Sequence, residues 1–197
     1  MIRQATLPLL FVLAPSLQPD PAEALERKIQ RAALRREPVV LGTAAAPYEP
    51  VGRGGDSSPL RRLLSSGDGL EITITTASPR ILGELELLAE LDRRHSVTVK
   101  MVAAVPSPLD PGPRLRAANS LAAEGITTVL LLAPAAERPG RFEEELRFLL
   151  ERARGVEIHD VEIETGAFRR AERAGLRSAF ERLRLEHGFP RSCAGRG

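Results

Sequence analysis

PVVLGTAAAPYEP, residues 38–50, sets a pattern that the rest of the chain repeats. A short apolar and β-branched run begins at Val39 and ends at Gly42 and Thr43, and a loop rich in alanine and proline follows. Short apolar runs bounded by glycine and proline are typical of buried strands in parallel sheets. In such sheets the loops that follow the strands carry the chemistry. The segment therefore predicts a buried strand, 39–43, that opens onto a functional loop.

The same unit of strand, loop and helix recurs about every 30 residues, as expected for βαβ units. Strands are expected at 39–43, 70–76, 96–104, 126–133 and 156–162, with a shorter apolar run at 7–13. Helices are expected to follow Asp20, Ser58 and Ser78 and to cover 113–124, 141–154 and 166–187. The last helix is expected to bury Gly175, Phe180 and Leu183. This alternation predicts an α/β fold with parallel strands in sequential order and helices outside.

Composition indicates an ordinary globular chain. Of the 197 residues, 43% are hydrophobic and 27% are charged, and the net charge is +2. These values predict a single domain, residues 1–190, with 191–197 as a flexible tail. Apolar runs stay short of the roughly 18 residues that a membrane span needs, so no membrane partner is expected. The apolar run 5–14 has a weak charged start for a secretory signal, which favours a strand and a cytoplasmic protein.

Cysteine and arginine usage excludes several classes of site. The single cysteine, Cys193, cannot form an internal disulfide, and it cannot hold a metal cluster alone. Lysine occurs only at positions 28 and 100, so most of the basic charge is arginine. Arginine is dense in the final helix and tail, which would suit nucleic acid. Glutamates are interleaved with these arginines, however, and this pattern favours a solvated helix face.

Several motifs, in a shared order, resemble radical S-adenosylmethionine proteins of the spore-photoproduct-lyase-like type. They are GTAAAPYEP at 42–50, ITTASP at 74–79, ILGELELLAEL at 81–91 and LLAP at 131–134. The resemblance covers most of the chain. It implies a partial (βα) barrel of the radical-SAM type whose first barrel strand is missing. It also implies a family chemistry based on a 4Fe-4S cluster and S-adenosylmethionine.

The chain departs from that family at the positions that matter most. The resemblance implies a Cys-x3-Cys-x2-Cys motif for the cluster, which this sequence lacks. Ala77 stands where the family has lysine, and Val102 stands where it has serine. Thr43, Tyr48 and Ser78 are the candidate remnants of a cofactor-binding site for S-adenosylmethionine. No catalytic residue and no metal ligand are assigned, and no cofactor is expected for this chain alone.

These departures lead to three hypotheses. The first is a degenerate radical-SAM-family protein without iron-sulfur catalysis of its own, acting as an accessory or binding module. The alternative is the C-terminal part of a split or mis-started radical SAM enzyme whose cluster-binding segment is encoded upstream. A third is a small-molecule-binding α/β protein with unrelated chemistry. An open barrel edge would invite a partner chain or self-association, and we expect Leu9–Leu13 to cover that edge beside 39–43.

Other titratable residues have simpler interpretations. His159 and Asp160 are adjacent on a strand and point to opposite faces, so they are expected not to form a metal pair. His95 precedes a strand and is expected to be structural. Glu162 and Glu164 share a face at the end of the last strand and could act as an acid/base pair. Without a histidine or lysine partner, they are expected to face water.

Overall fold

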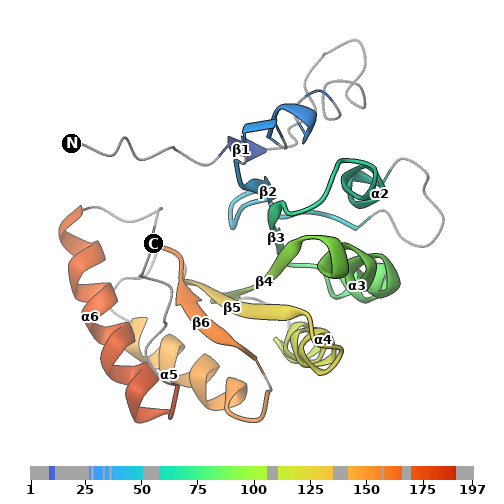
Figure 1. Cartoon of the computed structure of the whole chain (residues 1–197). Coiled ribbons are helices and arrows are strands. Elements are labelled where there is room, and N and C mark those ends of the chain that lie inside the picture. The colour runs from blue at the N-terminus through green and yellow to red at the C-terminus, as the bar shows by residue number, and fades with distance from the viewer. Residues whose placement is uncertain are drawn as a thin grey trace.

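The computed structural model describes residues 9–11, 27, 29–32, 34–35, 37–50, 58–105, 111–134, 142–156, 158–165 and 170–189. It is an α/β structure with one six-stranded, all-parallel sheet in the order β1-β2-β3-β4-β5-β6 (Figure 1). The predicted parallel, sequential arrangement is confirmed. The strands are β1 Leu9–Phe11, β2 Val39–Leu41, β3 Glu71–Thr76, β4 Ser96–Val105, β5 Thr127–Pro134 and β6 Asp160–Ile163.

Helices connect the strands and lie in succession around one side of the sheet (Figure 1). The described residues within 27–35 are helical and lie between β1 and β2 in the sequence. The first labelled helix, α2, follows β2. The helices that follow are α2 Pro59–Leu64, α3 Leu85–Arg94, α4 Gly112–Ala123, α5 Phe142–Ala153 and α6 Arg170–Glu186. Two of their ends match their sequence signals. Ser58 caps α2 through a hydrogen bond from the Leu60 amide, and Gly125, with φ of 83°, follows α4.

The apolar core lies between the sheet and these helices. Alternate strand residues point to that side, because successive side chains of a strand face opposite ways. They pack against helix residues such as Leu63, Leu88, Leu121 and Leu149. Burying each such leucine or isoleucine contributes about 1.5–3 kcal/mol. The buried strand residues on this side include Val39, Leu41, Ile72, Ile74, Val97, Val99, Leu130, Leu132 and Val161.

Leu9–Phe11, within the apolar run 7–13, form the edge strand beside β2. Residues 9 to 11 pair in parallel with residues 39 to 41, and the register aligns Leu9 with Val39. The prediction that this run lies against 39–43 is confirmed for Leu9–Phe11, while positions 12 and 13 lie outside the described residues. The position beside β2, where the first barrel strand was expected to be missing, is therefore occupied by the chain's own β1.

Three details differ from the sequence-based expectations. β6 begins at Asp160 and not at Val156, because the Val156 amide donates to the Ala153 carbonyl in a turn that ends α5. In α6, Gly175 is exposed, and the buried stripe runs instead through Leu176, Phe180 and Leu183. Those positions follow the i, i+4, i+7 spacing of one helix face.

The third difference lies in the segment after Ser78. Residues Pro79–Glu84 form a 3₁₀ helix, η1, before α3 begins. In a 3₁₀ helix the residues at i and i+3 lie one above the other. Ile81 and Glu84 are three apart, and both are buried. The tighter winding thus turns the Glu84 carboxylate inward.

Candidate functional site

The sheet face away from the helices carries a hollow of about 470 Å³. Its floor is formed by strand residues that alternate with the core residues, namely Val40, Thr73, Thr75, Lys100, Leu131 and Glu162. We call these six residues the inner face. The remaining lining residues are Pro38, Gly42, Thr43, Ala44, Glu71, Ile163 and Glu164. The hollow therefore combines aliphatic surface, hydroxyl groups and charges from five neighbouring strands.

An ion pair crosses the inner face. The Lys100 Nζ atom lies 2.6 Å from Glu162 Oε2, and the two side chains are 26% and 31% exposed. Lys100 belongs to β4 and Glu162 to β6, so the pair spans β5. Two strand spacings amount to about 9.6 Å, a distance that needs the full length of a lysine side chain. The expectation that Glu162 lacks a lysine partner is therefore wrong.

Sequence reasoning missed Lys100, although a signal was present. In the run SVTVKMV, residues 96–102, Thr98 and Lys100 alternate with buried valines. A charged residue on the face opposite a buried stripe points to a polar interior surface. The partner itself could not be found in this way, because Glu162 lies 62 residues away.

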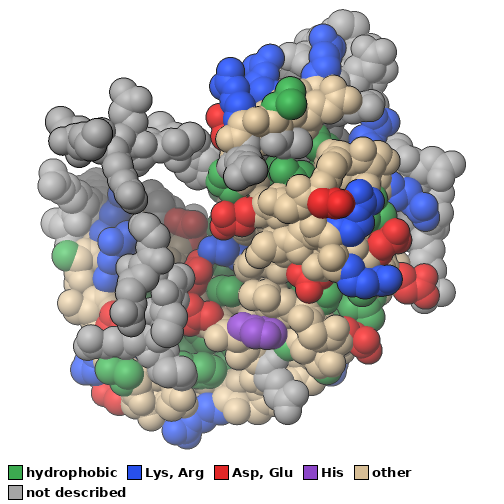
Figure 2. Space-filling model, viewed as in Figure 1, with side chains coloured by type: hydrophobic (Ala, Val, Ile, Leu, Met, Phe, Trp, Pro, Cys, Tyr) green, Lys and Arg blue, Asp and Glu red, His purple; other side chains and the backbone are tan. Residues whose placement is uncertain are grey.

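Charges around the hollow are predominantly acidic. Among the described residues that line it, Glu71, Glu162 and Glu164 are acidic and Lys100 is basic. Figure 2 shows acidic and basic side chains together near the middle of the molecular face in view. A recess lined by one sign of charge raises the local concentration of opposite charge. The lining thus favours ligands that carry a positive group.

The loop after β2 meets the hollow through Thr43. The Thr43 amide donates to the Ala46 carbonyl over 2.9 Å, and Thr43 Oγ1 accepts from the Ala46 amide over 3.0 Å. These two hydrogen bonds across a short loop hold the turn closed. Of the three candidate cofactor-binding residues, Thr43 is the one that lines the hollow.

Tyr48 is buried against the helix side. Its hydroxyl donates to Glu84 Oε2 over 3.0 Å, and Ser58 Oγ donates to the other oxygen of that carboxylate over 3.5 Å. Burial, reinforced by the negative charge of Glu84, raises the pKa of the Tyr48 phenol above its usual value. Tyr48 therefore fastens the loop after β2 to α2 and η1.

Ser78 lies beside Tyr48, and a shared threonine connects them. Thr76 Oγ1 donates to the Tyr48 carbonyl over 2.7 Å and accepts from the Ser78 amide over 3.1 Å. The next residue, Ala77, presents its carbonyl to Arg114 Nε at 2.9 Å. The structure thus brings Tyr48 and Ser78 together, and it places Thr43 separately on the hollow.

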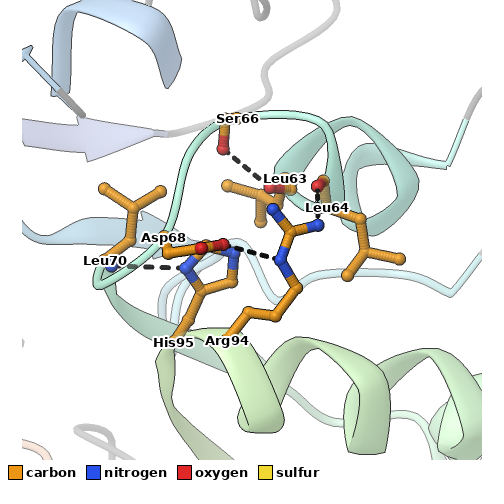
Figure 3. Close-up of polar contacts among 7 residues, drawn as sticks. All are labelled: Leu63, Leu64, Ser66, Asp68, Leu70, Arg94 and His95. Atoms are coloured by element: carbon orange, nitrogen blue, oxygen red, sulfur yellow. Dashed lines mark hydrogen bonds and ion pairs between the residues drawn. The ribbon is translucent and has the colours of Figure 1, made fainter.

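His95 lies at the opposite end of the sheet from the loops that follow the strands. Its Nδ1 atom accepts from the Leu70 amide over 3.2 Å, and Arg94 bridges Asp68 at 2.7 Å and the Leu64 carbonyl at 2.5 Å (Figure 3). Burial, followed by the charge of Arg94, lowers the pKa of His95, and Asp68 acts in the opposite direction. These contacts agree with a structural role.

The other sequence candidates are accounted for within the fold. His159 is exposed, and its Nδ1 atom accepts from the Thr128 amide over 3.1 Å. In α6, Arg182 pairs with Glu143 at 2.8 Å and with Glu186 at 3.3 Å. The buried Arg184 pairs with Asp160 at 3.2 Å. The half-exposed Arg182 agrees with the expected solvated helix face, whereas Arg184 is buried and forms an internal ion pair.

The residues present do not fit a 4Fe-4S cluster, because three thiolates are needed and the chain has one cysteine. That residue, Cys193, and the expected tail 191–197 lie outside the described residues. Within the described part of the chain, no group of three or more His, Cys, Asp or Glu side chains is placed to hold a metal ion. No helix in that part combines the length and apolar character of a membrane span.

Comparisons with protein families, with curated proteins and with solved structures find no match for this chain.

Proposed function

We propose that this chain is a binding module that holds a small, positively charged or zwitterionic molecule in the hollow of its sheet. The observation that carries the proposal is the Lys100–Glu162 pair, which lies on an open face beside about 470 Å³ of space. A ligand with both an amino group and a carboxylate could exchange partners with this pair. Its cation would take the glutamates, and its anion would take Lys100.

The energetics of the pair support a binding role over a stabilising one. Partly exposed ion pairs contribute about 0–1 kcal/mol to folding, because solvent screens them and two long side chains must be ordered. A ligand that excludes water from the hollow would strengthen every charge contact there. Opening the ion pair therefore costs little free energy in the free protein, and its charges contribute more to binding once a ligand covers them.

The family resemblance enters the same proposal. We propose that the sheet is a partial barrel of the radical-SAM type that has lost cluster chemistry and kept a binding face. The sequential parallel order and the shared order of motifs support this origin. Thr43, one of the proposed remnants of the cofactor site, lines the hollow. S-adenosylmethionine carries a sulfonium, an amino and a carboxylate group, so it is the first ligand to test.

Isothermal titration calorimetry with S-adenosylmethionine, lysine, glycerol and citrate tests the binding proposal. The first two ligands should bind, and the neutral and anionic ones should not. Glu162→Gln should weaken binding by about tenfold or more, because it removes a charge-assisted contact. Arg182→Gln breaks a surface ion pair on α6 and is the matched control. Equal affinities in both variants, or no binding by any cationic ligand, would contradict the proposal.

The proposed loss of cluster chemistry has its own test. Anaerobic reconstitution with iron and sulfide should leave the purified chain without stoichiometric iron, because one cysteine cannot bind three irons. No 5′-deoxyadenosine should form from S-adenosylmethionine under reducing conditions. Iron at cluster stoichiometry together with that product would refute this part of the proposal.

A further inference from the structure

We infer that Lys100 captures carbonyl compounds in the hollow by forming an imine with an aldehyde or ketone carbon. The inference rests on the proposed function, since it uses the same hollow, and it names the ligand class. It starts from the identity of the basic residue on the inner face.

Lysine is an unusual choice at this position of this chain. The sequence contains 28 lysine and arginine residues, and lysine stands only at positions 28 and 100. Arginine supplies the cation in the described ion pairs elsewhere, such as Arg94 with Asp68 and Arg184 with Asp160. Arginine binds carboxylates through two donors and cannot lose its proton in proteins, whereas lysine can become a free amine. Arginine could form an ion pair with Glu162 equally well if the pair had only a structural role.

The surroundings of Lys100 suit amine chemistry. Lys100 lines the hollow, and its Nζ atom lies 2.6 Å from the Glu162 carboxylate. Thr73 and Thr75 line the same hollow and carry hydroxyl groups able to hydrogen-bond a carbonyl or hydroxyl oxygen. The side chain of Lys100 is 26% exposed, so it is partly shielded from solvent. A nucleophile, a base and a space for the ligand thus meet at one point.

The step balances without a further reactant. Glu162 takes a proton from the Lys100 ammonium, and the free amine adds to the carbonyl carbon. A second nitrogen proton moves to the former carbonyl oxygen, which gives a carbinolamine. The protonated carboxyl of Glu162 then donates that proton to the hydroxyl group, which leaves as water. The carbon–oxygen double bond of the carbonyl is replaced by a carbon–nitrogen double bond, and nothing is oxidised or reduced. Hydrolysis by the reverse path releases the carbonyl compound.

Reductive trapping tests the inference on the full chain. The protein is incubated with dihydroxyacetone and sodium cyanoborohydride, which converts an imine to a stable secondary amine, and peptides are analysed by mass spectrometry. Lys28 is the internal reference. Labelling of Lys100 should exceed that of Lys28 by about tenfold or more in the folded protein. In concentrated urea the ratio should fall toward one, because the hollow no longer exists.

Two variants separate the roles of the pair. Lys100→Arg keeps the charge and should abolish the preferential label. Glu162→Gln should slow labelling of Lys100 by about tenfold or more, since the proton acceptor is lost. A Lys100 to Lys28 ratio near one in the unsubstituted folded protein would overturn the inference, and this measurement does not depend on any variant folding. An unchanged rate in Glu162→Gln would overturn the role of the carboxylate. Cation binding by calorimetry without trapping would leave the proposed function standing and refute the imine alone.

Discussion

Replacement of Gly42 by alanine should destabilise the protein strongly, because this glycine lies where β2 turns into the loop after it. Gly42 has φ of 76°, a conformation that costs other residues about 1–2 kcal/mol. A Cβ atom at this position would overlap the Tyr48 amide nitrogen and lie 2.5 Å from the Thr75 carbonyl oxygen. Those two groups hydrogen-bond each other over 2.7 Å. The added methyl group must therefore push apart a bond that anchors the loop.

The structure sets the expected magnitude. Separating a buried donor and acceptor costs about 1–3 kcal/mol beyond the backbone strain. Gly42→Ala should thus lower the free energy of unfolding by about 2–5 kcal/mol. For a chain of this size, that loss corresponds to a decrease in Tm of about 4–20 °C.

Gly125→Ala is the matched control. Gly125 has φ of 83°, and a Cβ atom built there meets no atom within 4 Å. It should therefore cost only the strain, about 1–2 kcal/mol. Urea denaturation of both variants, followed by circular dichroism, measures the difference. Equal losses in the two variants would refute the argument that the close approach of the Tyr48 amide matters.

The remaining predictions concern two titratable groups and the edge strand. Tyr48→Phe removes the donor to Glu84 Oε2 and should cost about 1–3 kcal/mol by urea denaturation. Because the pKa of Tyr48 is raised in the folded state, its contribution is present below pH about 10 and is lost as the pH rises further, a slope that Tyr48→Phe should remove. The pKa of His95 is lowered, so its contribution is present above pH about 6.5 and decreases as the pH falls. His95→Gln, which keeps an acceptor for the Leu70 amide, should flatten that slope in thermal melts. Deletion of residues 1–14 removes β1 and should cause self-association in size-exclusion chromatography with light scattering; a monomer of unchanged Tm would show that β1 does not protect the edge.

Local patterns in the sequence were sufficient for most of the secondary structure and for the strand order. Apolar runs bounded by glycine or proline located the strands, and helical spacing located most buried positions. The limits of such reasoning appear at Val156, where apolar residues predicted a strand and the backbone forms a turn. They appear also at Gly175, where Leu176 is the buried residue. The types of both elements were predicted correctly. The first residue of β6 and the buried positions of α6 were not.

The candidate site was predictable only in part, because its contacts join distant positions. Tyr48 was interpreted as a remnant of a cofactor site, yet its hydroxyl is held by Glu84, 36 residues away. That contact depends on a 3₁₀ helix for which the sequence carries no clear signal. Lys100 and Glu162 meet only because β4 and β6 flank the same strand. Periodicity identifies which face a residue occupies, and it does not identify the residue that it meets there.

The sequential strand order has a consequence for how the molecule opens. Its helix-side core divides into two clusters, one built around β2, β3 and α3 and the other around β5, α5 and α6, with β4 and α4 contributing to both. Among the described strands none is inserted between earlier ones, so either end of the sheet can detach without unthreading the other. The protein therefore resembles a short linear array whose terminal units can unfold as separate cooperative groups. Loss of the β5–β6 unit would remove Glu162 from Lys100, so partial unfolding at the C-terminal end would also abolish the charge pair of the hollow.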